Sequence, residues 1–412
     1  MTAPTPASAD VLIVGGGVIG LGIAWRAAQQ GLTVVVADPQ PGQGATHAAA
    51  GMLTPIAEAA YAEREIFALG QESLRRYPGF VAELEGATGL ATGFRQSGTL
   101  QVAYDADDLA LLAETRVLQQ SFGVQLEQLT ARECREAEPM LDPSVRGGLL
   151  APDDGSVDPR LLATALLAAA EGAGARLVRQ AVAEITTAGG DGGASGSGGA
   201  SGSCGGARLA DGSTVAARRV VLAAGWQSAA LAGLPPDAAP PVRPVKGQIL
   251  RLRAAGPAAA GLPPGLLRRT VRGVVHGSSV YLVPRDSGEL VIGATQEEMG
   301  ADTTVTAGGV WELLRDARAL VPGITELALA DVVAGLRPGT PDNAPLLGPA
   351  SMPGLVLATG HFRAGVLLTP VTADTVAAYL RTGASDPLWR AFAPGRFAAR
   401  DRVERQPAGA SA

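Results

Sequence analysis

Short runs of apolar, β-branched residues recur along the chain and alternate with longer stretches of helical spacing. Residues 10–14 and 32–37 are two such runs, and the stretch 21–31 between them has the spacing of a helix. Short apolar runs bounded by turn residues are typical of strands buried in a parallel sheet. Similar runs follow much later, at 218–224 and 354–359. We therefore predict one parallel sheet built from segments that are far apart in the sequence.

Other segments have the turn residues and alternation of a more open sheet. Residues 242–253 and 272–297 are rich in strand-forming residues, and 94–105 is predicted to form a hairpin. Helical spacing extends over 56–88 and 106–122. These segments predict a second, hairpin-rich sheet with helices beside it.

The two kinds of segment interleave, so we expect an α/β chain of two domains with discontinuous boundaries. A nucleotide-binding domain is predicted from residues 1–75, 149–235 and 331–400. A substrate-binding domain is predicted from residues 76–148 and 236–330. The length of 412 residues agrees with two or three domains of roughly 100–200 residues each.

The segment 189–206 has the sequence GGDGGASGSGGASGSCGG, which is mostly Gly, Ser and Ala. Tracts of this composition behave as flexible coils. Because strand-like stretches flank the segment on both sides, we expect a flexible surface loop that extends a hairpin.

Composition and charge narrow the function classes. Hydrophobic residues make up 47% of the chain and charged residues 17%, which supplies a core and excludes disorder over most of the chain. The net charge of −6 argues against a nucleic-acid partner, because such domains usually present a basic face. The apolar run 11–25 follows Asp10 directly and is shorter than the roughly 20 residues that span a bilayer. We expect neither a nucleic-acid nor a membrane partner.

Residues that form disulfides or ligate metals are scarce. The two cysteines, Cys134 and Cys204, are too few for a disulfide framework. The three histidines, His47, His276 and His361, are scattered, so we predict no metal site. Free cysteines fit a reducing compartment, and we expect a cytoplasmic protein.

A glycine-rich loop follows the first predicted strand. Gly15, Gly17 and Gly20 form G-x-G-x-x-G at the start of a helix, and Asp38 ends the next strand. This order is typical of a dinucleotide site: the glycines allow a tight turn and close approach of a pyrophosphate, and the acid binds the ribose. FAD, NAD and NADP all fit the pattern, although Pro39 in place of a basic residue disfavours NADP. The position of the motif at the N-terminus favours FAD, and a tight turn without a ligand is the alternative.

Several segments, in order along nearly the whole chain, resemble the D-amino acid oxidase-like flavoproteins and, within them, the glycine oxidases. YLVPR, GLRPGTPDNAPLLG and GHFRAGVLLTP are the most specific, whereas the glycine loop is shared by many FAD proteins. The matching stretches are DVLIVGGGVIGLGIAW, GATHAAAGML, GSVDPRLLATAL, VVLAAGWQS, PVRPVKGQIL, VYLVPRDSGELVIGAT, AGLRPGTPDNAPLLG and ATGHFRAGVLLTP.

The resemblance implies a Rossmann-like (GR2-type) FAD-binding domain interleaved with an antiparallel-sheet α+β substrate domain. It implies oxidation of glycine, or of sarcosine or small D-amino acids, with O2 reduced to H2O2 and the imine supplying thiamine thiazole synthesis. It also implies a homotetramer. Related sarcosine oxidases attach their flavin to a cysteine, but neither Cys134 nor Cys204 lies in a matching segment. We therefore expect non-covalent FAD.

The resemblance also implies substrate residues. Arg337 in GLRPGT matches the position that binds the carboxylate, and a guanidinium offers the two parallel donors that a carboxylate accepts. The alternative for Arg337 is a structural arginine bonded to loop carbonyls. Tyr281 is expected as a second carboxylate ligand, or else as a core tyrosine. Gln296 stands where a glycine oxidase can have an apolar side chain, and Arg363 is expected to stabilise the reduced flavin.

The implied cofactor residues lie in the glycine loop, after the second strand, in the loop that covers the flavin, at an adenine contact and in GHFRAGVL. They are Gly15, Gly17, Val18, Ile19, Gly20, Asp38, Pro39, Ala45, Thr46, Ala50, Gly51, Met52, Val182, Gly225, Gly360, His361, Phe362, Arg363, Ala364, Gly365, Val366 and Leu367. No residue is expected to act as a catalytic acid or base, because hydride would pass from the substrate Cα to flavin N5.

Other functions share this fold. One is a dehydrogenase of the same superfamily with an acceptor other than oxygen. Another is the FAD module of a tRNA-modifying enzyme, which the acidic charge disfavours, and a third is a non-catalytic nucleotide-binding subunit. Lys246, the chain's only lysine, is interpreted as a surface charge, and no role is predicted for it.

Overall fold

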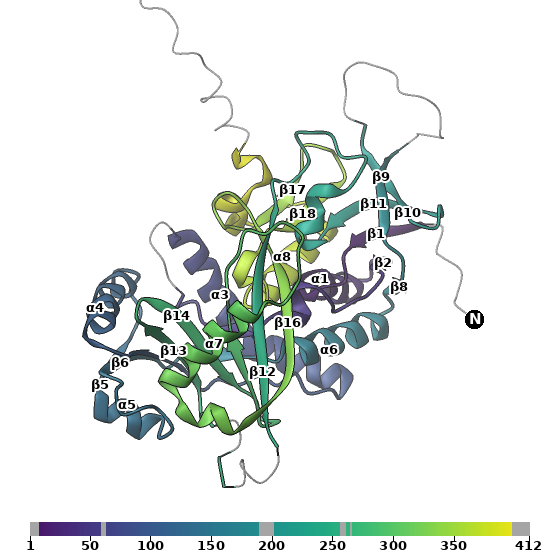
Figure 1. The fold of residues 1–412 in the computed structure, drawn as a ribbon. Helices are drawn as coiled ribbons and strands as arrows, with labels where there is room; N and C mark the ends of the chain where they lie inside the picture. The colour runs from purple at the N-terminus through teal and green to yellow at the C-terminus, as the bar shows by residue number, and fades with distance from the viewer. Residues whose placement is uncertain (1–7, 59–62, 189–201, 256–260, 264–265, 398–412) are drawn as a thin grey trace, which may run out of the picture. The chain divides into compact units, whose positions relative to one another are not determined.

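The computed structural model describes residues 8–58, 63–188, 202–255, 261–263 and 266–397, and its helices and strands are drawn in Figure 1. Within these ranges, no helix is both long enough and apolar enough to cross a membrane. The predicted loop 189–206 lies largely outside the described residues. Its last residues belong to a strand, because β10 begins at Cys204.

The chain forms two compact units, and each consists of segments distant in sequence. Unit 1 contains residues 1–43, 166–243 and 338–412, and unit 2 contains residues 44–165 and 244–337. These boundaries differ from the expected ones, which assign 44–75, 149–165 and 331–337 to the nucleotide-binding domain and 236–243 to the substrate-binding domain. Local pairing explains the first two: β3 (Met52–Leu53) pairs with β7 (Gly155–Ser156), so these two stretches belong together in unit 2.

Unit 1 contains a mostly parallel sheet with β1 at its centre. Strands β18, β11, β1, β2 and β8 are neighbours in this order and run parallel. Strand β17 lies antiparallel beside β18, and β9 and β10 form an antiparallel extension of β11. The strands are β1 (Ser8–Val14), β2 (Val34–Ala37), β8 (Arg176–Val178), β9 (Val182–Thr187), β10 (Cys204–Leu209), β11 (Thr214–Leu222), β17 (Leu346–Pro349) and β18 (Leu355–Thr359).

The prediction of one parallel sheet from distant apolar runs is confirmed, because the four runs correspond to β1, β2, β11 and β18. Successive residues of a strand point to opposite faces of the sheet. Leu12 and Ile13 are both fully buried, as are Val220 and Val221. Both faces of this sheet are therefore covered, which explains the continuous apolar runs.

Helices α1 (Val18–Gln29) and α8 (Thr369–Thr382) pack together in unit 1 (Figure 1). Gly22 permits the close approach, since a Cβ there would lie 3.2 Å from Ala373 Cβ. Arg26 Nε donates to Asp374 Oδ1 at 2.9 Å across the same helix pair. The other helical segments are α6 (Pro159–Gly172), which ends in this unit, η1 (Gly225–Ala230), η4 (Phe362–Ala364), η5 (Pro387–Phe392) and η6 (Pro394–Phe397).

Unit 2 is built on a second sheet, with strand order β16-β12-β15-β14-β13-β4-β6-β5. Helix α7 packs on it, and Leu313, Ala317 and Leu320 join the strand residues in one buried cluster. The strands are β4 (Thr99–Ala103), β5 (Glu127–Thr130), β6 (Gly147–Ala151), β12 (Arg243–Ala254), β13 (Thr270–Val275), β14 (Ser278–Pro284), β15 (Glu289–Gly293) and β16 (Leu327–Gly339). The helices are α2 (Ala45–Ala48), α3 (Arg64–Thr88), α4 (Ala106–Ser121), α5 (Ala131–Ala137), α7 (Ala307–Leu320) and η3 (Pro322–Glu326).

The prediction of a hairpin at 94–105 is wrong. Only β4 forms in this stretch, and it pairs in parallel with β13 and antiparallel with β6. The turn-like residues before it instead bring Arg95 to Ser156 in an isolated bridge. Local alternation identified the strand, but its partners come from distant parts of the chain.

Helix α3 has two glycines in contrasting backbone settings, which provides a stability test. Gly86 lies inside the helix, and a Cβ added there would meet no atom within 4 Å, whereas Gly89 ends the helix with a φ of +70°. We expect Gly86→Ala to stabilise the protein by about 1 kcal/mol, because alanine loses less backbone entropy in a helix. Gly89→Ala is expected to destabilise it, because an L side chain is strained at this φ. Urea unfolding of both variants measures the difference.

Candidate active site

The predicted dinucleotide residues of unit 1 follow the ends of neighbouring strands. Gly15 follows β1, Asp38 follows β2, Gly225 follows β11 and Gly360 follows β18. Because these strands are parallel, their carboxyl ends meet at one edge of the sheet, where α/β proteins bind nucleotides. The structure thus brings together four predicted groups that are distant in sequence.

The glycine loop has the close contacts that a dinucleotide loop requires. Gly15 has a φ of +110°, and a Cβ there would lie 2.4 Å from the Ala223 carbonyl oxygen. A Cβ at Gly20 would lie 1.9 Å from the carbonyl oxygen of Gly15. Helix α1 begins at Val18, and its N-cap, Gly17, makes no side-chain cap hydrogen bond. The start of a helix carries the positive end of the helix dipole and backbone N–H groups directed along the axis, which fits a pyrophosphate.

Asp38 holds the glycine loop in place through hydrogen bonds and can also accept a hydrogen bond from a ligand. Its Oδ2 accepts from the Gly16 backbone N–H at 2.6 Å, and its Oδ1 accepts from the Gln40 N–H at 2.7 Å. Ionised carboxylate oxygens together accept about four hydrogen bonds, so capacity remains for a ribose hydroxyl. Pro39 follows directly and is exposed. The residues of this edge fit a dinucleotide.

The segment GHFRAGVL connects β18 to α8. His361 is buried, and its Nε2 lies 3.2 Å from Thr372 Oγ1. Burial lowers the pKa of His361 to about 3, so its ring is neutral near pH 7 and serves as a hydrogen-bonding group. Phe362 has a φ of +45°, and Arg363 after it is exposed. The expected role of Arg363 at a reduced flavin stays a prediction.

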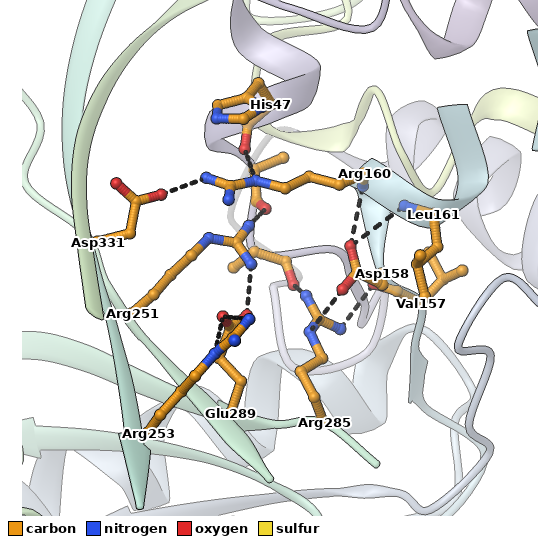
Figure 2. A network of polar contacts seen from close by, with 12 residues as sticks. His47, Val157, Asp158, Arg160, Leu161, Arg251, Arg253, Arg285, Glu289 and Asp331 are labelled. Carbon is orange, nitrogen blue, oxygen red and sulfur yellow. Dashed lines mark hydrogen bonds and ion pairs between the residues drawn. The ribbon is translucent and has the colours of Figure 1, made fainter. Parts of the chain in front are cut away.

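In unit 2, three arginines hold the loop that contains Ala50, Gly51 and Met52 (Figure 2). Arg160 Nε donates to the His47 carbonyl at 3.0 Å, and Arg251 Nη2 donates to the Ala49 carbonyl at 3.4 Å. Arg285 donates to the carbonyls of Ala50 and Val157. Sequence reasoning missed these anchors, because each donor lies more than a hundred residues from its acceptors.

The loop is also restricted by close backbone packing. Gly51 has a φ of +73°, and a Cβ there would lie 2.0 Å from the Val157 carbonyl oxygen. The Val157 N–H donates to the Gly51 carbonyl at 2.9 Å. Backbone packing therefore requires glycine at position 51, whether or not a ligand binds.

Arg285 provides a test of the loop anchor. Its side chain is almost wholly buried, and Arg285→Met would leave the carbonyls of Ala50 and Val157 without this donor. Since a buried unsatisfied polar group costs about 1–3 kcal/mol, we expect this variant to lose about 3 kcal/mol of unfolding free energy. Arg253→Met, which removes an exposed partner of Glu289, is the matched control and is expected to lose less than about 1 kcal/mol. Equal losses in denaturant unfolding would contradict the anchor.

Arg337 and Tyr281 lie together in unit 2. Burial raises the pKa of Tyr281, and the nearby Arg337 guanidinium opposes that rise. Arg337 Nη1 also donates to the carbonyls of Lys246 and Thr295, at 3.3 and 3.2 Å. Arg337 is therefore bonded to carbonyls, as the structural alternative requires. Donors on Nε and Nη2 remain for a carboxylate, because a guanidinium carries five N–H groups.

A small apolar cluster adjoins this pair. It contains Ala50 and Met52 from the loop and Tyr281 from β14, and its other members are Ile249, Val283, Val291, Ala294 and Val333. Predicted residues from the flavin-covering loop and from the substrate group thus pack in one place. Charged donors beside a small apolar surface suit a ligand that combines a carboxylate with a short side chain.

Arg272 and Glu58 are neighbours of this pair that sequence reasoning missed. Arg272 Nη1 donates to Glu58 Oε1 at 2.7 Å and lies 3.7 Å from Met52 Sδ. Arg272 is opposite Tyr281 in the β13–β14 register, which places the ion pair beside the hydroxyl. The strand pattern predicts β13, but its partner strand decides which side chains become neighbours.

The remaining predicted residues are placed as follows. Gln296 is exposed, and Thr46 is buried in α2 beside Ala45. Val182 begins β9 in register with Leu209 of β10. Nothing in the structure tests their expected contacts with ligands.

Neither cysteine is accessible for attachment of a cofactor. Cys134 and Cys204 are buried in separate apolar clusters, and burial raises the pKa of the Cys134 thiol to about 11. Among the described residues, no group of three or more His, Cys, Asp or Glu side chains is arranged to hold a metal ion.

Comparison with known proteins agrees with the geometry. The family described as FAD dependent oxidoreductase matches residues 10–379. The bifunctional protein ThiO/ThiG of Synechocystis sp. is 36% identical over 396 residues, which is 95% of this chain and 54% of that protein. The chain thus spans about half the length of its ThiO/ThiG relatives.

A glycine oxidase of Geobacillus kaustophilus is similar over most of its own length. It is 34% identical over 371 residues, covering 89% of this chain and 92% of that protein. The crystal structure of glycine oxidase from the same organism matches with a TM-score of 0.82 and 32% identity. That match covers 95% of this chain and 99% of the other.

Proposed function

Because the chain belongs to the FAD dependent oxidoreductase family, we propose that it oxidises glycine with O2 as the electron acceptor. The products are H2O2 and an imine, which water converts to glyoxylate and ammonia. Sarcosine and small D-amino acids are the alternative substrates of the same site. The relatives named glycine oxidase support the choice of substrate.

The observation that carries this proposal is the pairing of Arg337 with Tyr281 beside a small apolar cluster. A guanidinium and a phenol hydroxyl are both donors, and together they suit one carboxylate. Met52 and Ala50 lie in that cluster. An amino acid with little or no side chain fits this combination best.

The residues of unit 1 would hold FAD, the cofactor of the family. FAD, when bound, supplies the two-electron oxidation of the amine and the reaction with O2. The Gly15–Gly20 loop and the N-terminus of α1 hold the pyrophosphate, and Asp38 accepts from a ribose hydroxyl. Arg337 and Tyr281 bind the substrate carboxylate and so fix the direction of the amino acid. Orientation of this kind replaces acid or base catalysis by the chain.

Oxygen uptake by the purified holoenzyme tests the proposal. We expect glycine to support O2 consumption with an equal amount of H2O2, and sarcosine and D-alanine are compared at matched concentrations. Reduction of a dye by glycine without O2 uptake would instead identify a dehydrogenase. Failure of all three amines with both acceptors would contradict an amino-acid oxidase.

We also propose that the imine supplies thiamine thiazole synthesis, which the names of the ThiO/ThiG relatives support. Expression of the chain is expected to restore thiamine-independent growth to a bacterium that lacks its own glycine oxidase. If the chain is an active glycine oxidase but does not restore growth, the proposed link to thiamine synthesis would be wrong and the proposed activity would stand.

A further inference from the structure

Lys246 is not a surface charge, contrary to the interpretation from sequence. Its side chain is 1% exposed, and Nζ lies 2.7 Å from Asp302 Oδ2 and 3.5 Å from Glu297 Oε2. The hydrogen bond from Lys246 lowers the pKa of Asp302 to about 2, so this pair stays ionised near pH 7. A chain with 33 basic residues thus places its only lysine where the ammonium is enclosed.

The ammonium reinforces a seam between β12 and the segment after β15. The backbone N–H of Lys246 donates to the Glu297 carbonyl at 2.9 Å, and the Glu297 N–H donates back at 3.0 Å. Gln248 Nε2 donates to Glu297 Oε1 at 2.8 Å, and the Gln248 N–H donates to Thr295 Oγ1 at 2.8 Å. We call this set, Lys246, Gln248, Thr295, Glu297 and Asp302, the 246–302 seam.

Arg337 takes its two backbone acceptors from opposite sides of the 246–302 seam. One is the Lys246 carbonyl on β12, and the other is the Thr295 carbonyl on the facing segment. If the two sides separated, Nη1 would lose one of these acceptors. The direction of the guanidinium therefore depends on the seam remaining closed.

Gly247 provides the space in which the guanidinium lies. A Cβ at this position would be 2.2 Å from Arg337 Nη1, 2.4 Å from Nη2 and 2.5 Å from Cζ. The first atoms to meet an added methyl group thus belong to the movable end of a side chain. Gly247→Ala is accordingly expected to displace the guanidinium and leave the fold intact.

We propose that Lys246 and Gly247 are positioning residues for Arg337: Lys246 holds the seam whose carbonyls orient the guanidinium, and Gly247 leaves it room. This inference rests on the proposed function, because it treats Arg337 as the carboxylate-binding group. The inference gives a role to Lys246 and Gly247 of the PVKG stretch, for which the rest of the site suggests none.

The test measures binding of acetate, which is glycine without its amine, by holoenzyme variants. Acetate binding is followed through the visible spectrum of the flavin, and the KM and kcat for glycine are measured in parallel. We expect Gly247→Ala to weaken acetate binding and raise KM by about 100-fold, since a displacement near 1 Å has effects of this size. Lys246→Met is expected to do the same by about 10-fold, because backbone hydrogen bonds still hold part of the seam. Gly308→Ala, with open space around the added methyl, is the control and should change neither.

A double-mutant cycle separates positioning from stability. If Gly247 acts through Arg337, Gly247→Ala adds little further loss of kcat/KM in an Arg337→Met background. Fully additive losses, or a lower melting temperature with unchanged acetate affinity, would overturn the inference. A wild type that binds acetate but is not reduced by glycine would overturn the proposed function alone. A wild type that is reduced by glycine but does not bind acetate, with an unchanged KM for glycine in Gly247→Ala, would overturn the inference alone.

Discussion

Replacing Arg337 with methionine is expected to raise the KM for glycine by about 100- to 1,000-fold while FAD stays bound. Removing one partner of a hydrogen-bonded charge pair costs about 3–4 kcal/mol, and 1.4 kcal/mol corresponds to about tenfold in affinity. Methionine fills much of the same volume, so the neighbouring Tyr281 keeps its packing. Arg337 is not among the residues expected to hold the dinucleotide, which is why FAD content should not change.

Two further variants make the result specific. Arg337→Lys keeps the charge but offers no fork of parallel donors, so we expect an intermediate rise of about 10-fold or more. Arg318→Met removes an exposed arginine from α7 of the same unit and should leave KM unchanged. Steady-state oxygen uptake measures all three, and an unchanged KM in Arg337→Met would exclude Arg337 from the substrate site.

Replacing Gly20 with alanine is expected to abolish stable FAD binding. The added Cβ would lie 1.9 Å from the Gly15 carbonyl oxygen, which is backbone and cannot rotate away as a side chain can. Either the glycine loop or the start of α1 must move, and both present the N–H groups that face the pyrophosphate. The affinity for FAD should fall by more than about 100-fold, because several aligned donors are displaced at once.

Gly172→Ala is the matched control for this prediction, since it adds the same methyl group to unit 1 with no atom within 4 Å. FAD content after gel filtration and the dissociation constant from fluorescence titration measure the effect. Circular dichroism checks that Gly20→Ala still folds. A Gly20→Ala protein that binds FAD as tightly as the control would contradict the assignment of this loop.

The dinucleotide residues at the carboxyl edge of the unit 1 sheet can be predicted from sequence, because the motif that identifies them lies within one short stretch of the chain. A strand, three glycines, a helix, a strand and Asp38 appear in order within a few dozen residues. The prediction that β11 and β18 are buried strands follows from their continuous apolar character, and the structure places both in the same sheet as β1. Burial on both faces of a sheet requires an apolar run in each strand separately, so each strand can be identified without knowledge of its partners.

The side-chain contacts of unit 2, which contains the predicted substrate residues, are harder to predict from sequence, because they join strands that are distant in the chain. Arg337 is identified from a motif, but its acceptors at Lys246 and Thr295 follow from strand order. The prediction of a hairpin at 94–105 is wrong for the same reason, since β4 pairs with the distant strand β13. Sequence reasoning also missed Arg285 as an anchor of the loop that contains Ala50. A single sequence shows which polar and charged residues exist, whereas the order of strands in the sheet determines which of them lie within hydrogen-bonding distance of one another.

The measurement that tests the central claim most directly is an anaerobic titration of the purified yellow protein with glycine, followed at the visible flavin band. We predict that glycine bleaches this band and that admitting air restores it with formation of H2O2. Bleaching by sarcosine or D-alanine but not by glycine would keep the site and change the substrate. A band that no amine bleaches would contradict an amino-acid oxidase.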